Sequence, residues 1–431
     1  MQGQVTSIRN EILKFVQFAA LVITAIGISG STRTWAGTEK VLYSFTGGSD
    51  GDTPYANVVG RGGNLYGTTQ GGGAFGCGTV FEVKNSNGHW TEHVLYSFLG
   101  GSDGCNPYGN GVIFDKLGNI YGATWSGGAN GRGTVYRLQK ASNIWTETVL
   151  YNFTGGADGG GPFGGLILDS AGNLYGSTHD GGTYNWGTIF EMSPSGNTWT
   201  ENVLHSFSAV PDGFWPEDPL FLDQAGNLWS ETYEGGTGGG GFGYGMVFEL
   251  TPSNGSWTEN VIHSFDLTDG EWPHGGVVHH SGSWYGTTYY DGSGSCNGLG
   301  CGLVYQLKYS SKNGWQETVL YHFAGSNDAA GPFARLVFDN IGNMYGATYY
   351  GGGSTACTYS SGSIGCGTVY ELTPSGNTWT EKVLYAFSGG TDGSRPTFNS
   401  GSLVMDKLGN LYGTTSEGGA YGHGTVFEVT P

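Results

Sequence analysis

The chain has 431 residues, of which 84 are glycine, 14% are aromatic and only 12% are charged. Disordered chains are poor in aromatic residues and rich in charge, and after residue 30 no apolar pattern of helical period is sustained, so disorder, helical bundles and α/β folds are excluded. A net charge of −19 disfavours binding to nucleic acid or to anionic membrane surfaces.

Residues 1–36 have the features of a secretory signal peptide. Arg9 and Lys14 precede an apolar stretch from Phe15 to Ile28, and a Gly/Ser segment leads to the small residue Ala36. The apolar stretch is too short to span a bilayer. We therefore expect cleavage near Ala36 and a mature protein that is secreted, periplasmic or at the cell surface, with no membrane span. A retained N-terminal anchor is the alternative.

From residue 37 onward, three short motifs recur in a fixed order, each of them seven times. They are Val-Leu-Tyr-Ser-Phe, first at Val41, Leu-Tyr-Gly-Thr-Thr, first at Leu65, and Gly-Thr-Val-Phe, first at Gly78. In the third unit the pattern predicts strands at 165–169, 174–178, 188–192 and 199–207. Four short antiparallel strands per unit predict an all-β, seven-bladed β-propeller that forms a single domain over residues 37–431.

The two ends of the repeat array complement each other. Residues 38–45 form a fourth-strand motif with no blade before it, and residues 424–429 form a third-strand motif with no fourth strand after it. We expect these two segments to pair in the last blade. Such pairing closes the ring and leaves no exposed sheet edge.

The repeat resembles a known family of exported bacterial proteins. Gly71-Gly72 followed by residues 78–83, and Gly418-Gly419 followed by residues 424–429, resemble the Gloeo/Verruco tandem repeat of the choice-of-anchor family. The resemblance covers residues 38–431. It implies an exported repeat protein of unassigned activity, with no catalytic residues to carry over. Such proteins often end in a sorting anchor, and we expect none up to Pro431.

Export makes disulfides the expected state of the six cysteines. Two pairs each lie within one Gly/Ser loop, and the third pair follows by elimination, from two loops on the same face of the predicted propeller. A zinc site is the alternative, but the cysteine spacing matches no ligand pattern. The predicted disulfides are Cys77–Cys105, Cys296–Cys301 and Cys357–Cys366.

Each unit carries an aspartate and a proline in the loop that enters its first strand. Residues needed in every unit point to turn chemistry, in which Asp binds backbone amides and Pro fixes the strand entry. The alternative is a ring of carboxylates that gathers a cation at the channel mouth; otherwise we expect no metal and no cofactor. The aspartates are Asp50, Asp103, Asp158, Asp212, Asp269, Asp328 and Asp392, and the prolines are Pro54, Pro107, Pro162, Pro216, Pro273, Pro332 and Pro396.

Two histidines, His205 and His263, replace the tyrosine of the Val-Leu-Tyr-Ser-Phe motif. Both occur in predicted fourth strands. We interpret them as partly buried packing residues.

Units four and five depart from the repeat at equivalent positions. After the loop proline, where four units have Tyr or Phe, these two units have Glu217 and His274. The small residue that follows becomes Asp218 in unit four, and Trp215 and Trp272 precede the two prolines. A residue that breaks the repeat gives up local consistency, so these residues are candidates for function.

First strands line the channel of a propeller, so these residues are expected near its mouth on adjacent blades. Glu231, on the second strand of unit four, and Arg335, on the first strand of unit six, should face the same region. Rings beside carboxylates suit a sugar, whose apolar face stacks on a ring while its hydroxyls bond to acids. Further aromatic residues expected on this face are Trp125, His179, Tyr233, Tyr289, Tyr290, Tyr349 and Tyr350.

Two functions from different classes follow from this pattern. The first is binding of a glycan or another envelope component by a monomeric propeller. The second is a polysaccharide-active enzyme, in which Glu217 and either Asp218 or Glu231 form the carboxylate pair of a glycoside hydrolase. In a lyase variant, His274 transfers the proton and Arg335 holds a uronate. An ordinary solvated acidic loop is the non-functional interpretation of the carboxylates.

Overall fold

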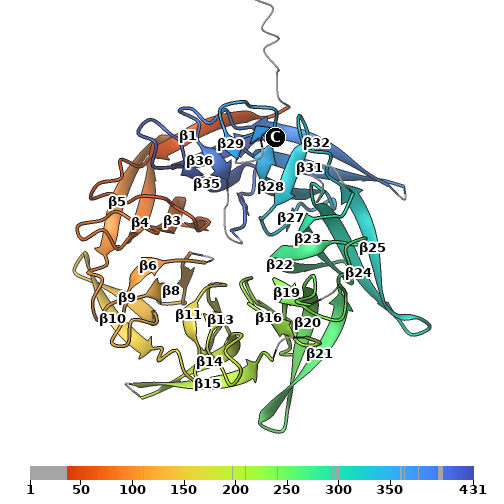
Figure 1. Ribbon diagram of the computed structural model, residues 1–431. Helices are drawn as coiled ribbons and strands as arrows, with labels where there is room; N and C mark the ends of the chain where they lie inside the picture. The colour runs from red at the N-terminus through yellow and green to blue at the C-terminus, as the bar shows by residue number, and fades with distance from the viewer. Residues whose placement is uncertain are drawn as a thin grey trace, which may run out of the picture. The chain divides into compact units, whose positions relative to one another are not determined.

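The computed structural model describes residues 36–431 other than 110, 197, 209, 240, 294–295, 297–299, 360–361, 364, 377 and 397–400. The predicted signal peptide, and the alternative of a retained anchor, lie outside the described residues except for Ala36. Ala36–Pro431 form one unit, in which antiparallel sheets follow one another around a central axis as seven blades (Figure 1). The all-β, seven-bladed prediction is confirmed. None of the described residues belongs to a helix long and apolar enough to cross a membrane.

In blades 1 to 4 the first to fourth strands follow one another outward from the axis. The first strand of blades 2 and 3 is divided into two pieces that both pair with the second strand, and in blade 4 β16 and β19 form a separate two-stranded sheet. Blade 1 has β2 (Val59–Arg61), β3 (Asn64–Thr69), β4 (Thr79–Ser86) and β5 (His89–Ser97). Blade 2 has β6 (Cys105–Pro107), β7 (Ile113–Phe114), β8 (Ile120–Ser126), β9 (Thr134–Ala141) and β10 (Ile144–Asn152). Blade 3 has β11 (Gly160–Pro162), β12 (Ile167–Leu168), β13 (Leu174–Asp180), β14 (Thr188–Ser195) and β15 (Thr198–Ser206). Blade 4 has β16 (Gly213–Phe214), β17 (Phe221–Leu222), β18 (Leu228–Thr232), β19 (Glu234–Gly235), β20 (Met246–Ser253) and β21 (Ser256–Ser264).

Blades 5 to 7 repeat this order, and the last blade takes one strand from the other end of the chain. Blade 5 has β22 (Glu271–His280), β23 (Ser283–Tyr290), β24 (Leu303–Ser310) and β25 (Gly314–His322). Blade 6 has β26 (Ala329–Pro332), β27 (Val337–Phe338), β28 (Met344–Gly351), β31 (Thr368–Ser375) and β32 (Thr378–Ala386), with a small hairpin of β29 (Thr358–Tyr359) and β30 (Gly362–Ser363). Blade 7 has β33 (Ser394–Pro396), β34 (Val404–Met405), β35 (Leu411–Glu417), β36 (Thr425–Thr430) and β1 (Thr38–Ser44).

The ring closes as the sequence predicts. β1 pairs antiparallel with β36, from Thr38 opposite Thr430 to Ser44 opposite Thr425. Figure 1 shows the two ends of the described chain side by side in one blade, β1 in red and β36 in blue. The pairing gives β36 a partner on its outer side and makes β1 the outermost strand of the last blade, as the fourth strands are in the other blades.

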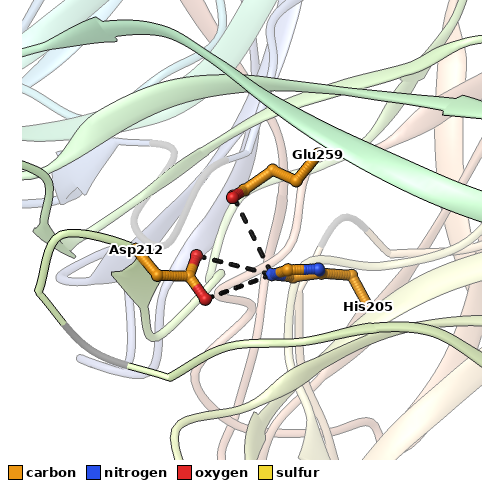
Figure 2. Close-up of side chains that lie close together, drawn as sticks. All are labelled: His205, Asp212 and Glu259. Atoms are coloured by element: carbon orange, nitrogen blue, oxygen red, sulfur yellow. Dashed lines mark hydrogen bonds and ion pairs between the residues drawn. The ribbon is translucent and has the colours of Figure 1, made fainter.

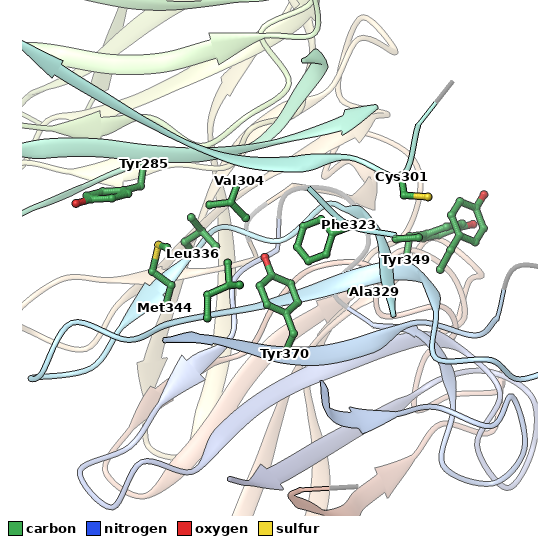
Figure 3. Packing of buried hydrophobic residues seen from close by; sticks show 12 residues of the cluster. Tyr285, Cys301, Val304, Phe323, Ala329, Leu336, Met344, Tyr349 and Tyr370 are labelled. Atoms are coloured by element: carbon green, nitrogen blue, oxygen red, sulfur yellow. The ribbon is translucent and has the colours of Figure 1, made fainter. Parts of the chain in front are cut away.

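Aromatic pairs fill the space between blades. The last residue of each Val-Leu-Tyr-Ser-Phe motif is buried and packs edge-on against an aromatic ring on the third strand of the next blade. Figure 3 shows one such contact, between Phe323 and Tyr370, in the core between blades 5 and 6. Edge-to-face pairs add about 0.5–1.5 kcal/mol each beyond their buried area. The seven pairs, with centroids 5.0–5.4 Å apart, are Phe45–Phe81, Phe98–Tyr136, Phe153–Phe190, Phe207–Phe248, Phe265–Tyr305, Phe323–Tyr370 and Phe387–Phe427.

Glycine in the second strand makes room for these rings. A Cβ atom on Gly67 would lie 2.6 Å from the ring of Phe81, and one on Gly413 would lie 2.7 Å from Phe427. Both distances are too short for a side chain. The Tyr-Gly-Thr motif therefore carries glycine because the third-strand ring lies against the backbone of the second strand.

The first strands differ from the prediction. In blade 3 only β12 (Ile167–Leu168) lies within the expected strand at 165–169, and a second short piece, β11, precedes it; both pair with β13. Phe163 N still donates to Ser177 O at 3.2 Å, and the regular ladder resumes only at Ile167. Only in blade 5, among the described residues, is the first strand continuous, and there β22 has an irregular register between His274 and Val278.

The three predicted disulfides are present, and no described cysteine is free. The turn role of the repeated aspartates is also confirmed. Asp50 accepts a hydrogen bond from the backbone N–H of Thr46 at 2.8 Å, and Asp158 accepts one from Thr154 at 2.8 Å. The other entry loops repeat this contact between an Asp and the N–H three or four residues earlier.

Candidate functional site

The entry loops and the loops between second and third strands lie on one face, which we call the entry face. The two kinds of loop are joined by backbone hydrogen bonds, such as Gly73 N to Gly48 O at 2.9 Å and Gly182 N to Gly156 O at 2.8 Å. The residues predicted to be functional are therefore positioned by two sets of loops that support each other.

The residue before each loop proline holds its backbone at positive φ. This conformation is uncommon for residues with a side chain and costs about 1–3 kcal/mol. Backbone hydrogen bonds hold it in place: Trp215 N donates to Trp186 O at 3.1 Å, and Trp272 N donates to Tyr244 O at 3.0 Å. The seven residues, with φ between 55° and 62°, are Thr53, Asn106, Gly161, Trp215, Trp272, Gly331 and Arg395.

Aromatic side chains of neighbouring blades contact one another around the entry face. Successive ring centroids are 4.7–6.4 Å apart. The chain of contacts begins in blade 1 and reaches blade 6 without a break. We call this set the aromatic crown: Tyr55, Tyr108, Trp125, Phe163, His179, Trp215, Tyr233, Trp272, Tyr289, Phe333 and Tyr349.

Arg395 of blade 7 extends the crown toward its beginning. Its guanidinium lies over the ring of Tyr349, 4.9 Å from the centroid, and pairs with Glu417 at 2.6 Å. Burial raises the pKa of Tyr55, and the charges of Glu417 and Arg395 shift it in opposite directions. Blade 7 thus meets the crown through an ion pair where the other blades supply rings.

Two of the predicted aromatic residues occupy places that glycine leaves open. A Cβ atom on Gly161 would lie 3.1 Å from the ring of Trp125, and one on Gly331 would lie 2.8 Å from the ring of Tyr289. In blades 3 and 6, an aromatic residue from the preceding blade's second strand therefore covers the position before the proline.

The most regular stacking lies in blades 4 and 5. The ring of His179 is stacked on Trp215 at 5.2 Å with an interplanar angle of 10°. Tyr233 is stacked on Trp272 at 4.8 Å and 24°, and Trp272 lies 6.3 Å from Tyr289 at 20°. These contacts hold the rings in fixed orientations on the entry face, so a ligand does not have to order them on binding.

Glu217 belongs to the crown through His179. Nε2 of His179 lies 3.1 Å from Oε1 of Glu217, and Nδ1 lies 2.9 Å from Oδ1 of Asp180. Burial alone would lower the pKa of His179, but hydrogen bonds and the charges of the two carboxylates raise it overall. His179 thus connects Glu217 on one ring nitrogen with Asp180 on the other.

Two further acids stand near the same rings. Glu234 and Glu271 are partly exposed, and burial raises the pKa of both. The charges of Glu271 and Glu217 add to this effect on Glu234. Burial, and then the charges of Glu217, Glu234 and Glu271, raise the pKa of Tyr233. Three carboxylates therefore surround the Tyr233–Trp272 stack.

Asp218 and Glu231 lie beneath the crown, with no exposed surface. Oδ1 of Asp218 accepts a hydrogen bond from Gly275 N at 2.8 Å, and Oε2 of Glu231 accepts one from Gly276 N at 2.9 Å. Oε1 of Glu231 also accepts a hydrogen bond from the Tyr305 hydroxyl. Burial and the charge of Asp218 raise the pKa of Glu231 well above its ordinary value. The two carboxyl groups link blade 4 to the backbone of blade 5.

His274 and Arg335 extend this buried polar group toward blade 6. The His274 side chain is 3% exposed, and its Nδ1 lies 3.6 Å from Oδ1 of Asp218. Nη2 of Arg335 donates to the Val277 carbonyl at 2.6 Å. Burial lowers the pKa of Arg335 to about 10, although the charges of Glu231 and Asp218 act to raise it. Arg335 therefore remains charged at neutral pH.

The structure thus divides the predicted site residues into two layers. The outer layer is on the entry face and contains Glu217 with the predicted aromatic residues Trp125, Trp215, Tyr233, Trp272, Tyr289 and Tyr349. The inner layer is buried and contains Asp218, Glu231 and His274, with Arg335 partly buried beside them.

Four exposed aromatic residues on the entry face were missed by sequence reasoning. Phe75, Tyr184, Phe242 and Tyr421 are 58–62% exposed, and each lies between a second and a third strand. Phe242 contacts Phe214, which in turn contacts Trp215 of the crown. The available signal was an aromatic residue at a repeated position in loops otherwise made of glycine and polar residues.

Three clefts lie on the opposite face, where the turns between first and second strands project. One is lined by Phe221, Trp229, His279 and Trp284, among others, and two involve the turn at Asp406. The predicted site residues are absent from the lining of these three clefts. These three clefts are therefore distinct from the predicted site on the entry face.

Fold and site together define a disulfide-bonded tandem-repeat β-propeller with an aromatic entry face. The chain belongs to the Gloeobacter/Verrucomicrobia repeat family, whose profile matches residues 31–170 and 146–359. The resemblance in the repeat motifs is thereby confirmed. No curated protein matches the sequence.

Solved structures resemble the fold at low sequence identity. A candidate oxidoreductase (glucose dehydrogenase) of Thermus thermophilus is 12% identical, with a TM-score of 0.42, over 91% of this chain and 100% of that one. A gluconolactonase of Xanthomonas campestris is 12% identical, with a TM-score of 0.38, over 70% and 82%. A protein of unknown function from Dyadobacter fermentans is 13% identical, with a TM-score of 0.40, over 80% and 96%. At these values nothing about activity follows.

Proposed function

We propose that this protein binds a carbohydrate across the aromatic crown. The observation that supports this function is the continuous run of rings on one face, of which all but Phe163 and Tyr349 are partly exposed. The carboxylates of Glu217, Glu234 and Glu271 stand among these rings. Rings supply apolar contact for the faces of pyranose units, and carboxylates accept hydrogen bonds from their hydroxyls.

The extent of the aromatic crown favours a polymer over a single sugar. Small-molecule sites enclose most of their ligand, whereas the crown passes through successive blades and has further exposed rings at its edge. Phe75, Tyr184 and Tyr421 lie in the outer loops of blades 1, 3 and 7. A polysaccharide chain can contact several of these rings at once. Several weak contacts made by one chain raise its overall affinity above that of any single contact.

Burial of the inner carboxyl groups favours binding over hydrolysis. A glycoside hydrolase needs two carboxyl groups that reach opposite sides of one glycosidic bond. Asp218 and Glu231 have no exposed surface and are already bonded to the backbone of blade 5. Glu217 is the one member of the predicted pair with exposed surface, 15% of its side chain. Neither Asp218 nor Glu231 can therefore serve as an accessible second carboxylate beside Glu217 in this arrangement.

The disulfides support a place of action outside the cytoplasm. Three disulfides in one chain are typical of exported proteins, because thiols stay reduced in the cytosol. We propose that the mature protein acts outside the cytoplasm, where its ligand is a wall, envelope or extracellular polysaccharide.

The test compares wild type with Trp272→Gly by affinity electrophoresis and calorimetry against a panel of plant and bacterial polysaccharides. Glycine is the residue that blades 3 and 6 carry at this position, so the backbone conformation is retained. Tyr309→Ala is the matched control, because Tyr309 is 58% exposed on β24, outside the crown. We expect Trp272→Gly to weaken binding at least tenfold and Tyr309→Ala to leave it unchanged.

Two results would contradict the proposal. One is equal binding by wild type and Trp272→Gly. The other is turnover of a polysaccharide or chromogenic glycoside by wild type that Glu217→Gln abolishes, which would establish the enzymatic alternative.

A further inference from the structure

Each junction between neighbouring blades brings the same three positions together. A fourth strand supplies Tyr or His, the following entry loop supplies Asp, and the fourth strand of the next blade supplies Glu. The sets are Tyr43, Asp50 and Glu92; Tyr96, Asp103 and Glu147; Tyr151, Asp158 and Glu201; His205, Asp212 and Glu259; His263, Asp269 and Glu317; Tyr321, Asp328 and Glu381; and Tyr385, Asp392 and Glu39.

At the five tyrosine junctions the chemistry is that of a hydrogen bond. The Tyr hydroxyl donates to the Asp carboxylate at 2.8–3.3 Å. A phenol is a poor ligand for divalent metals at neutral pH because its ordinary pKa is about 10. These junctions serve as internal references for the two that carry histidine.

The junction of blades 3 and 4 has a different geometry, shown in Figure 2. Nε2 of His205, at the end of β15, lies 3.3 Å from Oδ2 and 3.4 Å from Oδ1 of Asp212. The same nitrogen lies 3.9 Å from Oε1 of Glu259 on β21. The three side chains are 14–20% exposed. One atom from each lies within 4.8 Å of the others.

These separations suit a shared ion better than a direct hydrogen bond. Hydrogen bonds between imidazolium and carboxylate are about 2.7–2.9 Å long, as between His263 and Asp269 at 2.9 Å. Ligand atoms about 2.1 Å from a tetrahedral zinc lie about 3.4 Å from one another. The distances from His205 to Asp212 match this ligand-to-ligand separation. The distance from His205 to Glu259 is longer, and a small side-chain movement would close the difference.

The surrounding groups orient the ligands from outside. Asp212 accepts hydrogen bonds from Gly213 N at 2.8 Å, from Ser208 N at 2.9 Å and from Ser208 Oγ at 3.0 Å. Oε1 of Glu259 is buried and accepts no hydrogen bond from the described residues, as is also true of the equivalent glutamate oxygen at the other six junctions. The feature particular to this junction is therefore the histidine that faces both carboxylates, and a carboxylate held by its neighbours, as Asp212 is, can orient toward a metal.

His179 shows why proximity of acids to a histidine is not sufficient. Its two carboxylate neighbours, Asp180 and Glu217, lie on opposite ring nitrogens, so they cannot share one ion with it. At His205, both carboxylates face the same nitrogen. Among the described residues, the group at His205 is the one that brings three ligand atoms this close together.

We propose that His205, Asp212 and Glu259 bind one divalent transition-metal ion of the zinc class, with water in the remaining position. One imidazole and two carboxylates suit Zn²⁺, Mn²⁺ or Fe²⁺ better than Ca²⁺ or Mg²⁺. The ion would connect β15 of blade 3 with β21 of blade 4. This inference is independent of the carbohydrate proposal, since the site lies at a blade junction and shares no residue with the crown.

The test uses untagged full-length protein, stripped with EDTA and dialysed, then titrated with Zn²⁺ in competition with a chromophoric chelator. His205→Tyr is the decisive variant because it restores the residue of five sister junctions and should fold normally, as circular dichroism will verify. His263→Tyr is the matched control at the junction with a direct hydrogen bond. Glu259→Gln tests a second ligand without altering size.

We expect wild type to bind one Zn²⁺ per chain and to gain thermal stability on adding it. His205→Tyr and Glu259→Gln should bind at least tenfold more weakly and lose most of that gain, whereas His263→Tyr should match wild type. Equal Zn²⁺ affinity of His205→Tyr and wild type would overturn the proposal, as would the absence of saturable binding to wild type. We also expect a large excess of Mg²⁺ to leave the binding of Zn²⁺ undiminished.

Discussion

Replacing Glu92 by glutamine should stabilise the protein above pH 7 and leave it nearly unchanged at pH 5. Burial, and then the charge of Asp50, raise the pKa of Glu92 from 4.5 to about 8 in the folded chain. Asp50 is held by the Tyr43 hydroxyl at 2.8 Å and by Thr46 N. The folded state therefore keeps the Glu92 proton over a pH range in which the unfolded state releases it.

The sign follows from linkage. A carboxyl group whose folded pKa lies above its unfolded pKa favours folding at low pH, and that contribution is lost as the pH rises from about 4.5 to about 8. At about 1.4 kcal/mol per pKa unit the full loss would be about 4–5 kcal/mol. Solvent screening of a partly exposed group reduces this to about 1–3 kcal/mol. Glutamine is neutral at every pH and avoids the loss.

Thermal unfolding at pH 5 and pH 8.5, followed by calorimetry, measures the effect. We expect equal Tm values at pH 5 and a Tm about 2–6 °C higher for Glu92→Gln at pH 8.5. The difference between wild type and variant cancels the titration of all other groups, including the histidines. Glu147→Gln, at the next junction, should behave in the same way. A variant destabilised equally at both pH values would refute the raised pKa of Glu92 in the folded chain.

Three further outcomes follow from the fold. Replacing Cys77 and Cys105 by serine should lower the free energy of unfolding by about 2–4 kcal/mol, measured by urea titration without reductant. Deleting residues 37–45 should leave β36 without its partner and give aggregates on size-exclusion chromatography, and a synthetic peptide of that segment should restore monomer; a soluble, stable deletion variant would argue against ring closure by β1. Trp272→Gly should change the free energy of unfolding by no more than about 1 kcal/mol, because relief of its positive φ offsets the lost ring contacts; a much larger loss in urea unfolding would make Trp272 a structural residue.

The sequence predicts the fold well because every structural requirement appears seven times. Repeated glycine in the second strand and repeated phenylalanine at the end of the fourth strand mark the space between blades. The pairing of residues 38–45 with 424–429 could be inferred because each segment lacks a neighbour. The division of first strands such as β11 and β12 could not, since the motif does not reveal that the regular ladder is interrupted between Pro162 and Ile167.

The sequence predicts which residues form the candidate site, but it does not predict how deeply each of them is buried. Departures from the repeat led to Glu217, Asp218, Glu231 and His274, but a sequence cannot show which side of a loop faces the interior. Three of the four lie under the crown, and Glu217 alone is on the entry face. The effect of Gly161 and Gly331, which admit rings from adjacent blades, also depends on contacts between units.

The junction groups escaped sequence analysis for a related reason. Glu92 and Glu259 lie on equivalent strands, β5 and β21, in which exposed and partly buried residues alternate. The other polar residues of these strands face solvent, so both glutamates resemble ordinary surface positions in the sequence. Only the arrangement of neighbouring blades shows that each faces an aspartate of the preceding entry loop. Contacts between units that are distant in sequence determine the electrostatics here.

A crystal structure of the protein soaked with the oligosaccharide selected from the polysaccharide panel tests the carbohydrate proposal most directly. We predict sugar rings against the aromatic crown in blades 4 and 5, within hydrogen-bonding distance of Glu217, Glu234 or Glu271. Sugar bound solely in the clefts of the opposite face, beside Trp229 and Trp284, would contradict the assignment of the entry face as the binding surface.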